Sequence, residues 1–260
     1  MIYHAGPPPH YRFALLAQVQ HAVFTRLGGY SEGPFASLNV GHTVGDDATH
    51  VEANHAALYA ALGIAPAQVV CGRQVHGSRV AVVTAADGGQ ALPATDALVS
   101  DTPGLALLLR YADCVPVFFA APRGGAVGLA HAGWRGTVAR IAAVTALSLA
   151  EAFGCRPQEI VAGIGPCIGP CCYQVGPEVL AQVRAAFGEG APALISRQQA
   201  DGAAHLDLWE ANVHQLREVG VEQIEVAGLC TRCRRDLFYS HRGDGGRTGR
   251  FAAVIVNRPG

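Results

Sequence analysis

The sequence predicts an α+β fold with a mixed β-sheet. Segments with strand patterns and segments with helix patterns alternate irregularly, and hairpin-like pairs of strands lie among them. No GxGxxG or P-loop pattern stands where a strand turns into a helix, so neither a dinucleotide site nor a P-loop nucleotide site is expected. No long linker divides the chain, and we therefore expect residues 1–260 to form one domain.

The N-terminal half is expected to begin with a mobile, proline-rich leader over residues 1–12. Short strands are predicted next, and a helix follows that begins after the capping segment 46–49 and ends at Gly63. Further strand patterns lead to a hairpin whose second strand is apolar enough to be buried on both faces. The strands are predicted at 13–16, 19–24, 69–71, 75–78 and 80–83, the helix at 51–62, and the hairpin at 96–100 and 105–110.

The C-terminal half is expected to continue with two apolar strands and one long helix that ends at Gly154. An irregular, exposed excursion is predicted at 191–204. The remaining strands are predicted at 112–119, 126–131, 160–164, 224–227 and 251–256, and the helices at 137–153, 177–187 and 207–220.

Charge and hydropathy exclude several classes of protein. The formal net charge of -1 and the pI near 6.8 provide no field that would attract nucleic acid or an anionic membrane surface. No uncharged apolar run reaches the ~20 residues of a membrane span, and the N-terminus lacks a signal-peptide pattern. We therefore expect a cytoplasmic protein whose eight cysteines are reduced.

Three residues are candidate metal ligands. His76, Cys114 and His131 each stand at or near the end of a predicted strand, beside glycine or proline. Two imidazoles and one thiolate suit zinc, and three protein ligands leave the fourth position open for water, whose pKa zinc lowers to roughly 7. A rival interpretation makes Cys114 a nucleophile with one histidine as its base and Asp113 as the orienting group. Asp113 points to the opposite face from Cys114, so three roles stay open for it: partner of a histidine, general acid or base, or solvated carboxylate.

An anion site is predicted next to these ligands. The turn 132–137 comes before the predicted long helix, so its free N–H groups favour an anion, with Arg135 as a clamp and Trp134 as a stacking surface. The alternative is an exposed Arg135 and a core Trp134. The segment 232–250 is rich in arginine and also contains His241. Since the net charge is near zero, we interpret this segment as a loop that binds a small anionic substrate rather than nucleic acid.

A second group of cysteines has two interpretations. Cys230 and Cys233 have the two-residue gap of many zinc sites, whereas the other cluster, at Cys167, Cys171 and Cys172, lacks it. These residues are either ligands of a four-thiolate structural zinc or ordinary loop cysteines.

Several motifs together resemble the YfiH-type laccase-domain family, also called the multicopper polyphenol oxidase or peptidoglycan editing factor family. The motifs cover nearly the whole chain from about Ala22 onward, and they lie at 73–77, 112–116, 130–136, 165–173 and 238–242. The resemblance implies a layered α-β-β-α sandwich with mixed sheets, similar to that of the CNF toxins, and a zinc site at His76, Cys114 and His131. It also implies purine nucleoside phosphorylase activity on adenosine, inosine, guanosine and methylthioadenosine, with adenosine deaminase as a second activity.

These motifs also supply the remaining candidate residues. As catalytic residues we predict Asp113, Cys114 and Arg135. As substrate contacts we predict Arg135, Gln74, Trp134, His241 and Arg242, the last two standing where relatives have a tyrosine or a second arginine. The expected partners are a nucleoside and phosphate, and the expected assembly is a monomer or a homodimer.

The sequence argues against a copper oxidase. A trinuclear copper cluster needs paired His-x-His motifs, and none of the eleven histidines is two positions from another. The leading hypothesis is therefore a zinc-dependent purine nucleoside phosphorylase with one zinc ion. The alternatives are a cytoplasmic Cys/His hydrolase of amide-linked peptidoglycan precursors and a non-enzymatic, zinc-stabilised binding protein.

Overall fold

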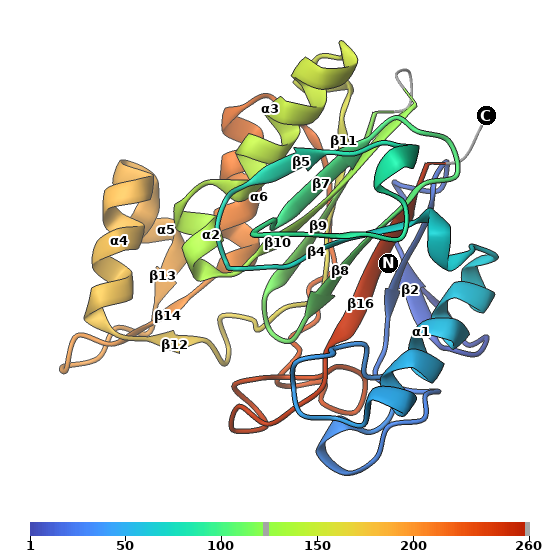
Figure 1. Ribbon diagram of the computed structural model, residues 1–260. Coiled ribbons are helices and arrows are strands. Elements are labelled where there is room, and N and C mark those ends of the chain that lie inside the picture. Colours follow the sequence, from blue (N-terminus) through green and yellow to red (C-terminus); the bar gives the residue numbers. More distant parts are fainter. Residues whose placement is uncertain (122–124, 258–260) are drawn as a thin grey trace.

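Two large β-sheets lie face to face in the computed structural model, which describes residues 1–121 and 125–257 (Figure 1). The seven-stranded sheet has the order β1-β2-β3-β16-β8-β4-β6, and the six-stranded sheet has the order β15-β11-β9-β10-β7-β5. The strands of the first are β1 (Ile2–His4), β2 (His10–Arg12), β3 (Gln20–Phe24), β4 (Val69–Gly72), β6 (Ala91–Leu92), β8 (Ala106–Tyr111) and β16 (Phe251–Val256). The strands of the second are β5 (Val80–Val82), β7 (Ala97–Ser100), β9 (Val115–Ala121), β10 (Ala126–Ala132), β11 (Val161–Ile164) and β15 (Gln223–Val226).

Helices cover the outer faces of both sheets. Helix α1 packs on the seven-stranded sheet, and α3 and α6 pack on the six-stranded sheet (Figure 1). The predicted α+β class with α-β-β-α layers is confirmed. A small third sheet lies beside α4 and α5 and consists of β12 (Gln174–Val175), β13 (Ile195–Ser196) and β14 (Ala204–Leu206). The helices are α1 (Ala48–Leu62), α2 (Trp134–Val138), α3 (Ile141–Phe153), α4 (Pro177–Phe187), α5 (Ala191–Leu194) and α6 (Leu208–Glu218).

The alternation of side chains along the central strands builds this layering. In β8, Leu107 and Leu109 face the core between the sheets, whereas Ala106 and Leu108 face α1. This strand is therefore buried on both faces, as predicted. Each central strand contributes to two cores, because it lies between a helix layer and the other sheet.

The N-terminal segment and one helix differ from the predictions. Residues 1–12, expected to be a mobile leader, form β1 and β2, which pair with each other and with β3. The proline-rich segment connects these two strands as a tight bend, in place of the mobile leader that was expected. The long helix predicted at 137–153 is two helices, α2 and α3, because Arg140 between them adopts a left-handed backbone conformation.

Local patterns misled the prediction at four other places. The expected hairpin of 96–100 and 105–110 does not form, since β7 and β8 belong to different sheets. The segments 13–16 and 75–78 are not strands, and 191–204 contains α5 and β13. The expectation that residues 1–260 form one domain stays a prediction.

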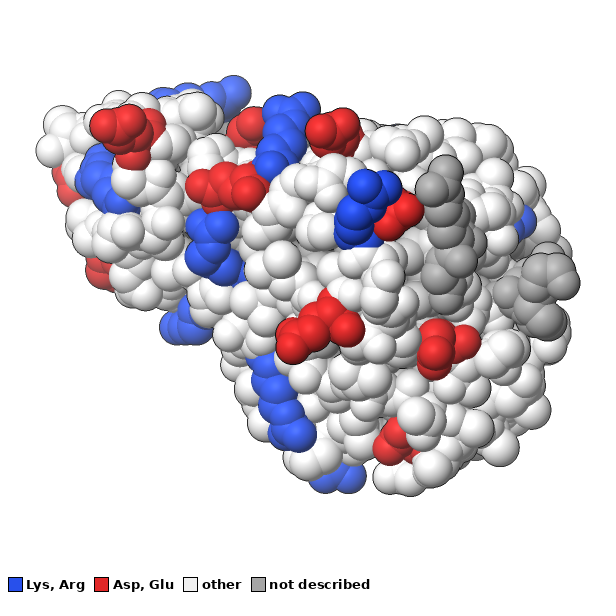
Figure 2. Space-filling model, turned by 90° about the horizontal axis from the view of Figure 1, so that it is seen from above, with Lys and Arg blue, Asp and Glu red and all other residues white. Residues whose placement is uncertain are grey.

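Surface charge is mixed in sign on the face seen in Figure 2, where acidic side chains lie between arginines. Among the described residues, no helix combines the length and the apolar character that crossing a membrane requires.

Candidate functional site

The three predicted metal ligands meet at the junction of the two large sheets. His76 lies in the loop between β4 and β5, Cys114 lies directly before β9, and His131 belongs to β10. Their potential ligand atoms are all within 4.8 Å of one another. The rings of His76 and His131 have centroids 4.9 Å apart and meet at 68°. The structure thus brings together three residues that are distant in sequence, in an arrangement suited to one metal ion.

A buried carboxylate, which the sequence analysis did not identify as a site residue, holds both histidines. Asp96 has no solvent exposure and accepts the backbone N–H groups of Val75, His76 and Gly77 at 2.9 to 3.1 Å. These bonds fix His76 in a left-handed backbone conformation with φ of 62°. The same carboxylate lies 2.9 Å from Nδ1 of His131. Because Nδ1 then carries the proton, Nε2 of His131 is left free to bind a metal.

Electrostatics favour a thiolate at Cys114. Burial alone would raise the pKa of this thiol, but the charge and hydrogen bond of His131, together with His76, lower the pKa to about 6. Burial alone would lower the pKa of His131, but Cys114 and Asp96 raise it to about 9. Hydrogen bonds from His131 and from the N–H groups of Gly77 and Val75 outweigh burial and hold the pKa of Asp96 below its usual value. The thiolate is the form that binds metals.

The local backbone leaves space for an ion. A Cβ atom on Gly133 would lie 2.9 Å from Sγ of Cys114 and 3.0 Å from Cδ2 of His76, so only glycine fits there. One thiolate and two imidazoles match the donor preference of zinc, and the described residues place no fourth such ligand in this group. The residues therefore fit a metal ion with an open coordination position.

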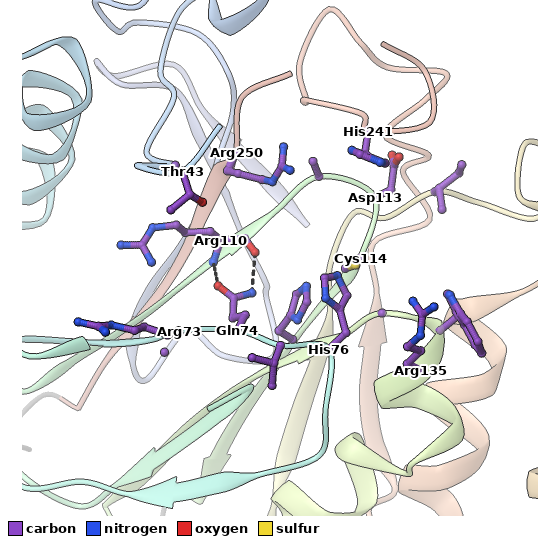
Figure 3. A pocket seen from close by; sticks show the side chains of 18 of the residues that line it. Thr43, Arg73, Gln74, His76, Arg110, Asp113, Cys114, Arg135, His241 and Arg250 are labelled. Atoms are coloured by element: carbon purple, nitrogen blue, oxygen red, sulfur yellow. Dashed lines mark hydrogen bonds between the residues drawn. The ribbon is translucent and has the colours of Figure 1, made fainter. Parts of the chain in front are cut away.

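A pocket of about 1230 Å³ opens above the three ligands (Figure 3). It is lined by all nine residues that the sequence analysis proposed for the site. These are Gln74, His76, Asp113, Cys114, His131, Trp134, Arg135, His241 and Arg242. Their placement on one pocket gives each of them access to a common ligand, while their individual roles stay predictions.

Gln74 is engaged with the backbone of β8. Its Nε2 donates to the carbonyl of Arg110 at 2.8 Å, and its Oε1 accepts the N–H of Arg110 at 3.0 Å (Figure 3). This pair of bonds fixes the loop that carries His76 against the neighbouring strand. The geometry therefore favours a positioning role for Gln74 over the predicted substrate contact.

Asp113 connects three segments of chain, and the groups that donate hydrogen bonds to its carboxylate are not histidines. Its carboxylate accepts the Thr231 hydroxyl at 2.6 Å and the N–H of Arg242 at 2.7 Å, and its carbonyl accepts the N–H of Ile168. Only 8% of the residue is exposed, and its φ is 82°. Of the three roles left open for Asp113, neither histidine partner nor solvated carboxylate matches this environment. The histidine partner is Asp96 instead.

At the predicted anion site, Arg135 lines the pocket, but the helix that begins there is short. Arg135 is exposed, and its guanidinium stacks 4.4 Å from the centre of the half-buried Trp134 ring. Both residues belong to α2, which has only five residues. Its small dipole weakens the expected contribution of a helix N-terminus to anion binding, so the contribution of Arg135 becomes more important.

The C-terminal loop reaches the same pocket. His241 and Arg242 are exposed at its rim, and Arg242 donates to the carbonyl of Gln174 at 2.8 Å. The guanidinium of Arg242 also lies 5.3 Å from the centre of the Tyr173 ring. These contacts join the C-terminal loop to the loop that follows β11.

Three further arginines line the pocket, and of these only Arg250 was part of a predicted anion-binding segment, the arginine-rich loop 232–250. Arg73, Arg110 and Arg250 lie on one side of the metal ligands in Figure 3, whereas Arg135 lies on the other. Arg73 is part of the first family motif, which was the available signal for it. Nothing in the pattern around Arg110 distinguished it, because it is the last residue of the predicted apolar strand 105–110.

Comparison with known proteins decides the family. The family model described as multi-copper polyphenol oxidoreductase laccase matches residues 20–258. The protein belongs to this laccase family. The family resemblance predicted from the motifs is thus confirmed, and the family includes proteins named YlmD and YfiH.

Relatives in the laccase family carry a consistent name. Purine nucleoside phosphorylase YlmD of Geobacillus stearothermophilus is 44% identical over 243 residues, which cover 90% of this chain and 88% of the relative. Purine nucleoside phosphorylase of Deinococcus radiodurans is also 44% identical, over 91% of this chain and 88% of its own.

Solved structures of the laccase family share the fold. The crystal structure of YlmD from Geobacillus stearothermophilus has a TM-score of 0.94 at 41% identity and covers 98% of both chains. That of Bacillus licheniformis YfiH has a TM-score of 0.94 at 38% identity, over 98% of this chain and 99% of its own.

Proposed function

We propose that the protein is a zinc-dependent purine nucleoside phosphorylase that acts in the cytoplasm. One observation carries the proposal: the open group His76, Cys114 and His131 faces a pocket lined by arginines, in a chain 44% identical to proteins named purine nucleoside phosphorylase. The expected substrates are phosphate and adenosine, inosine, guanosine or methylthioadenosine. Zinc is favoured over copper for two reasons. One thiolate and two imidazoles suit a tetrahedral zinc ion with its fourth position open, and the sequence has no paired His-x-His motif for a trinuclear copper cluster.

Phosphorolysis requires that two substrates be held in line. A phosphate oxygen attacks C1′ of the ribose while the bond from C1′ to the purine nitrogen breaks. The bonding electron pair leaves with the purine, which takes up a proton, and ribose 1-phosphate is the other product. A zinc ion held by the three ligands supplies Lewis-acid chemistry toward a group in its open position. The chain itself positions the substrates and excludes water.

The arginines of the pocket lie on opposite sides of the metal ligands, and we assign the binding of phosphate to one side. Arg135 stacks on Trp134, which holds its guanidinium at the pocket. Arg250 lies on the other side and is half-buried. Burial lowers the pKa of its guanidinium, although the charges of Cys114 and Asp113 oppose this shift. We assign phosphate to Arg135 with Arg242, since a guanidinium binds phosphate oxygens in pairs. His241 and Trp134 then border the nucleoside.

Adenosine deamination is a second activity of the same site in this proposal. Water would replace the amino group on the purine ring, and the amino group would leave as ammonia. A zinc ion held by His76, Cys114 and His131 would supply the Lewis-acid chemistry that activates water. Asp113 is less suited to carry the proton than the sequence suggested, because both of its carboxylate oxygens accept hydrogen bonds.

A thiol hydrolase of amide-linked cell-wall precursors is the alternative, and one observation favours it. Cys114, His131 and Asp96 form a chain of thiol, base and orienting carboxylate, with the pKa of Cys114 lowered to about 6. Such an enzyme would keep its activity after removal of all metal. A non-enzymatic zinc protein is less suitable, because a purely structural site would be closed by a fourth ligand.

The proposal is tested with inosine and phosphate. Purified protein is expected to release hypoxanthine and ribose 1-phosphate only when phosphate is present. Replacing Cys114 by alanine should lower kcat/KM by more than about 100-fold, because the metal loses a ligand. Cys155→Ala, which changes a half-buried cysteine outside the pocket, is the matched control and should keep full activity.

Two results would contradict the proposal. Hypoxanthine release without phosphate would indicate a hydrolase, and a fully active Cys114→Ala variant would exclude both the metal mechanism and the thiol mechanism. Amide hydrolysis that survives chelation, without any phosphorolysis, would favour the alternative enzyme. Adenosine deamination is checked in the same preparations by the conversion of adenosine to inosine.

A further inference from the structure

A second group of cysteines gathers at the edge of the six-stranded sheet. Strands β11 and β15 are parallel neighbours, so the chain leaves both strands at the same edge. The loop after β11 carries Cys171 and Cys172, and the loop after β15 carries Cys230 and Cys233. A β-bridge between Cys167 and Cys230 continues the pairing into these loops. The topology therefore brings four thiols together that are about 60 residues apart in sequence.

The spacing of the sulfur atoms is that of metal ligands. All four Sγ atoms lie within 4.8 Å of one another. Sγ of Cys233 is 3.7 Å from that of Cys171 and 3.5 Å from that of Cys172. A disulfide would need about 2.05 Å. Four sulfurs at about 2.3 Å from one zinc ion are separated by about 3.8 Å along each edge of the tetrahedron, which agrees with the observed distances.

The surrounding backbone is built for close approach and for negative charge. The N–H of Gly169 donates to Sγ of Cys230 at 3.2 Å. A Cβ atom on Gly169 would lie 2.8 Å from the Trp209 ring and 3.3 Å from Cβ of Cys230, so the loops meet this closely only with glycine there. Zinc with four thiolates carries a net charge of about −2, and two guanidinium groups lie beside it. Arg197 and Arg232 reach the carbonyl oxygens of Cys171 and Cys172 at 3.4 and 3.5 Å.

We propose that Cys171, Cys172, Cys230 and Cys233 bind a structural zinc ion, separate from the group at His76, Cys114 and His131. Four protein ligands close the coordination sphere, so this ion would hold structure and take no part in the reaction. The proposal rests on the geometry of the four thiols and is independent of the proposed phosphorylase activity.

The ion would fix one wall of the substrate pocket. Tyr173 follows Cys172 directly, and Thr231, between Cys230 and Cys233, donates to Asp113. Farther along the same loop, Arg242 bonds to the segment after Tyr173 through the carbonyl of Gln174. Binding at the four thiols therefore positions Arg242 and Tyr173 at the pocket rim. The four cysteines are positioning residues for this wall, because none of them lines the pocket.

Zinc content tests the site directly. In the full chain purified without chelator, the Cys171→Ser/Cys233→Ser double variant should contain one equivalent of zinc fewer than the unchanged protein. Cys155→Ser, which removes a cysteine outside both groups, should lose none. Cys114→Ser should lose a different equivalent, so failure of one site is distinguishable from failure of the other.

A cobalt spectrum covers the case in which the double variant does not fold. Cys114→Ser protein loaded with Co²⁺ should keep the strong thiolate-to-cobalt charge-transfer bands and the intense visible bands of a tetrahedral four-thiolate site.

In active preparations of the double variant, KM for inosine should rise roughly tenfold while kcat stays within about twofold, since the pocket wall is displaced and the metal ligands are not.

Three results would overturn the proposal. They are an unchanged zinc content in the double variant, iron in place of zinc, and a disulfide from Cys233 to Cys171 or Cys172 in protein purified without oxidant. A cobalt spectrum of Cys114→Ser that lacks thiolate charge-transfer bands would overturn it as well. Loss of the inosine reaction alone, with the zinc equivalent retained, would contradict the proposed function and leave the four-thiolate site in place.

Discussion

At the scale of single residues, Asp96 organises the candidate metal centre although it is no ligand of it. Its partners His76 and His131 lie 20 and 35 positions away, so no local pattern connects them. The sequence placed Asp96 at the start of an apolar strand, and a carboxylate at such a buried position is itself the signal, because burial of an unpaired charge is unfavourable. Motifs identified the three ligands, but only the fold shows what orients them.

Replacing Asp96 by asparagine should therefore weaken metal binding without removing a ligand. Asp96 accepts hydrogen bonds from four donors on its two oxygens, whereas the amide of asparagine has only one acceptor oxygen. The NH₂ group would replace the other oxygen, and it is a donor, so it cannot accept the hydrogen bonds made there. We expect zinc affinity to fall about 10- to 100-fold, measured by competition with a chelator. Asp101→Asn, at an exposed position outside the pocket, is the control. Equal affinities of the two variants would rule out the orienting role of Asp96.

At the scale of elements, the patterns located most strands and helices but not their partners. Segments 96–100 and 105–110 are apolar on both faces, so alternation could not show that β7 and β8 belong to different sheets. The break between α2 and α3 occurs at Arg140, where no glycine or proline signals it. The helix from Ala48 to Leu62 was predicted well, because Asp47 caps its start and Gly63 ends it in a left-handed conformation.

Strand β3 provides a pH-dependent contribution to stability through His21. Nε2 of this buried ring accepts the N–H of Phe13 at 2.7 Å, so Nδ1 carries the proton and donates to the carbonyl of Val19. Burial lowers the pKa of His21 to about 4, below the usual value near 6.5. The unfolded chain therefore binds a proton that the folded chain does not bind, and stability is lost as pH falls from about 6.5 toward about 4.

This contribution is measured as a difference in the free energy of unfolding. Between about pH 7.5 and about pH 5, the His21 term should destabilise the protein by about 2 kcal/mol. His21→Gln has no titrating ring, so its urea-unfolding free energy should decrease less over the same interval, even if it is less stable at both pH values. Identical pH-dependent losses in the two proteins would show that His21 is not responsible.

At the scale of the whole molecule, the core between the two large sheets holds the layers together. Phe118 of β9 is fully buried there, with its ring 5.4 Å from that of Phe13. Phe118→Ala should lower the free energy of unfolding by about 3 to 5 kcal/mol, because the sheets cannot fully close the cavity. Val82→Ala, on edge strand β5 with 54% exposure, should change it by less than about 0.5 kcal/mol. Urea titrations compare the two, and a small effect at Phe118 would mean that the layers are held elsewhere.

The position of the candidate metal centre gives an ion there a second effect. His76 lies where the chain passes from β4 in one sheet to β5 in the other, and Cys114 lies where it passes from β8 to β9. Binding and folding are then thermodynamically linked, and zinc at 100 times its Kd would add about 2.7 kcal/mol to the free energy of unfolding. Linkage acts in both directions. A core variant such as Phe118→Ala that loosens the sheets should also release zinc more readily, so metal retention would report on the integrity of a core that the ion never touches.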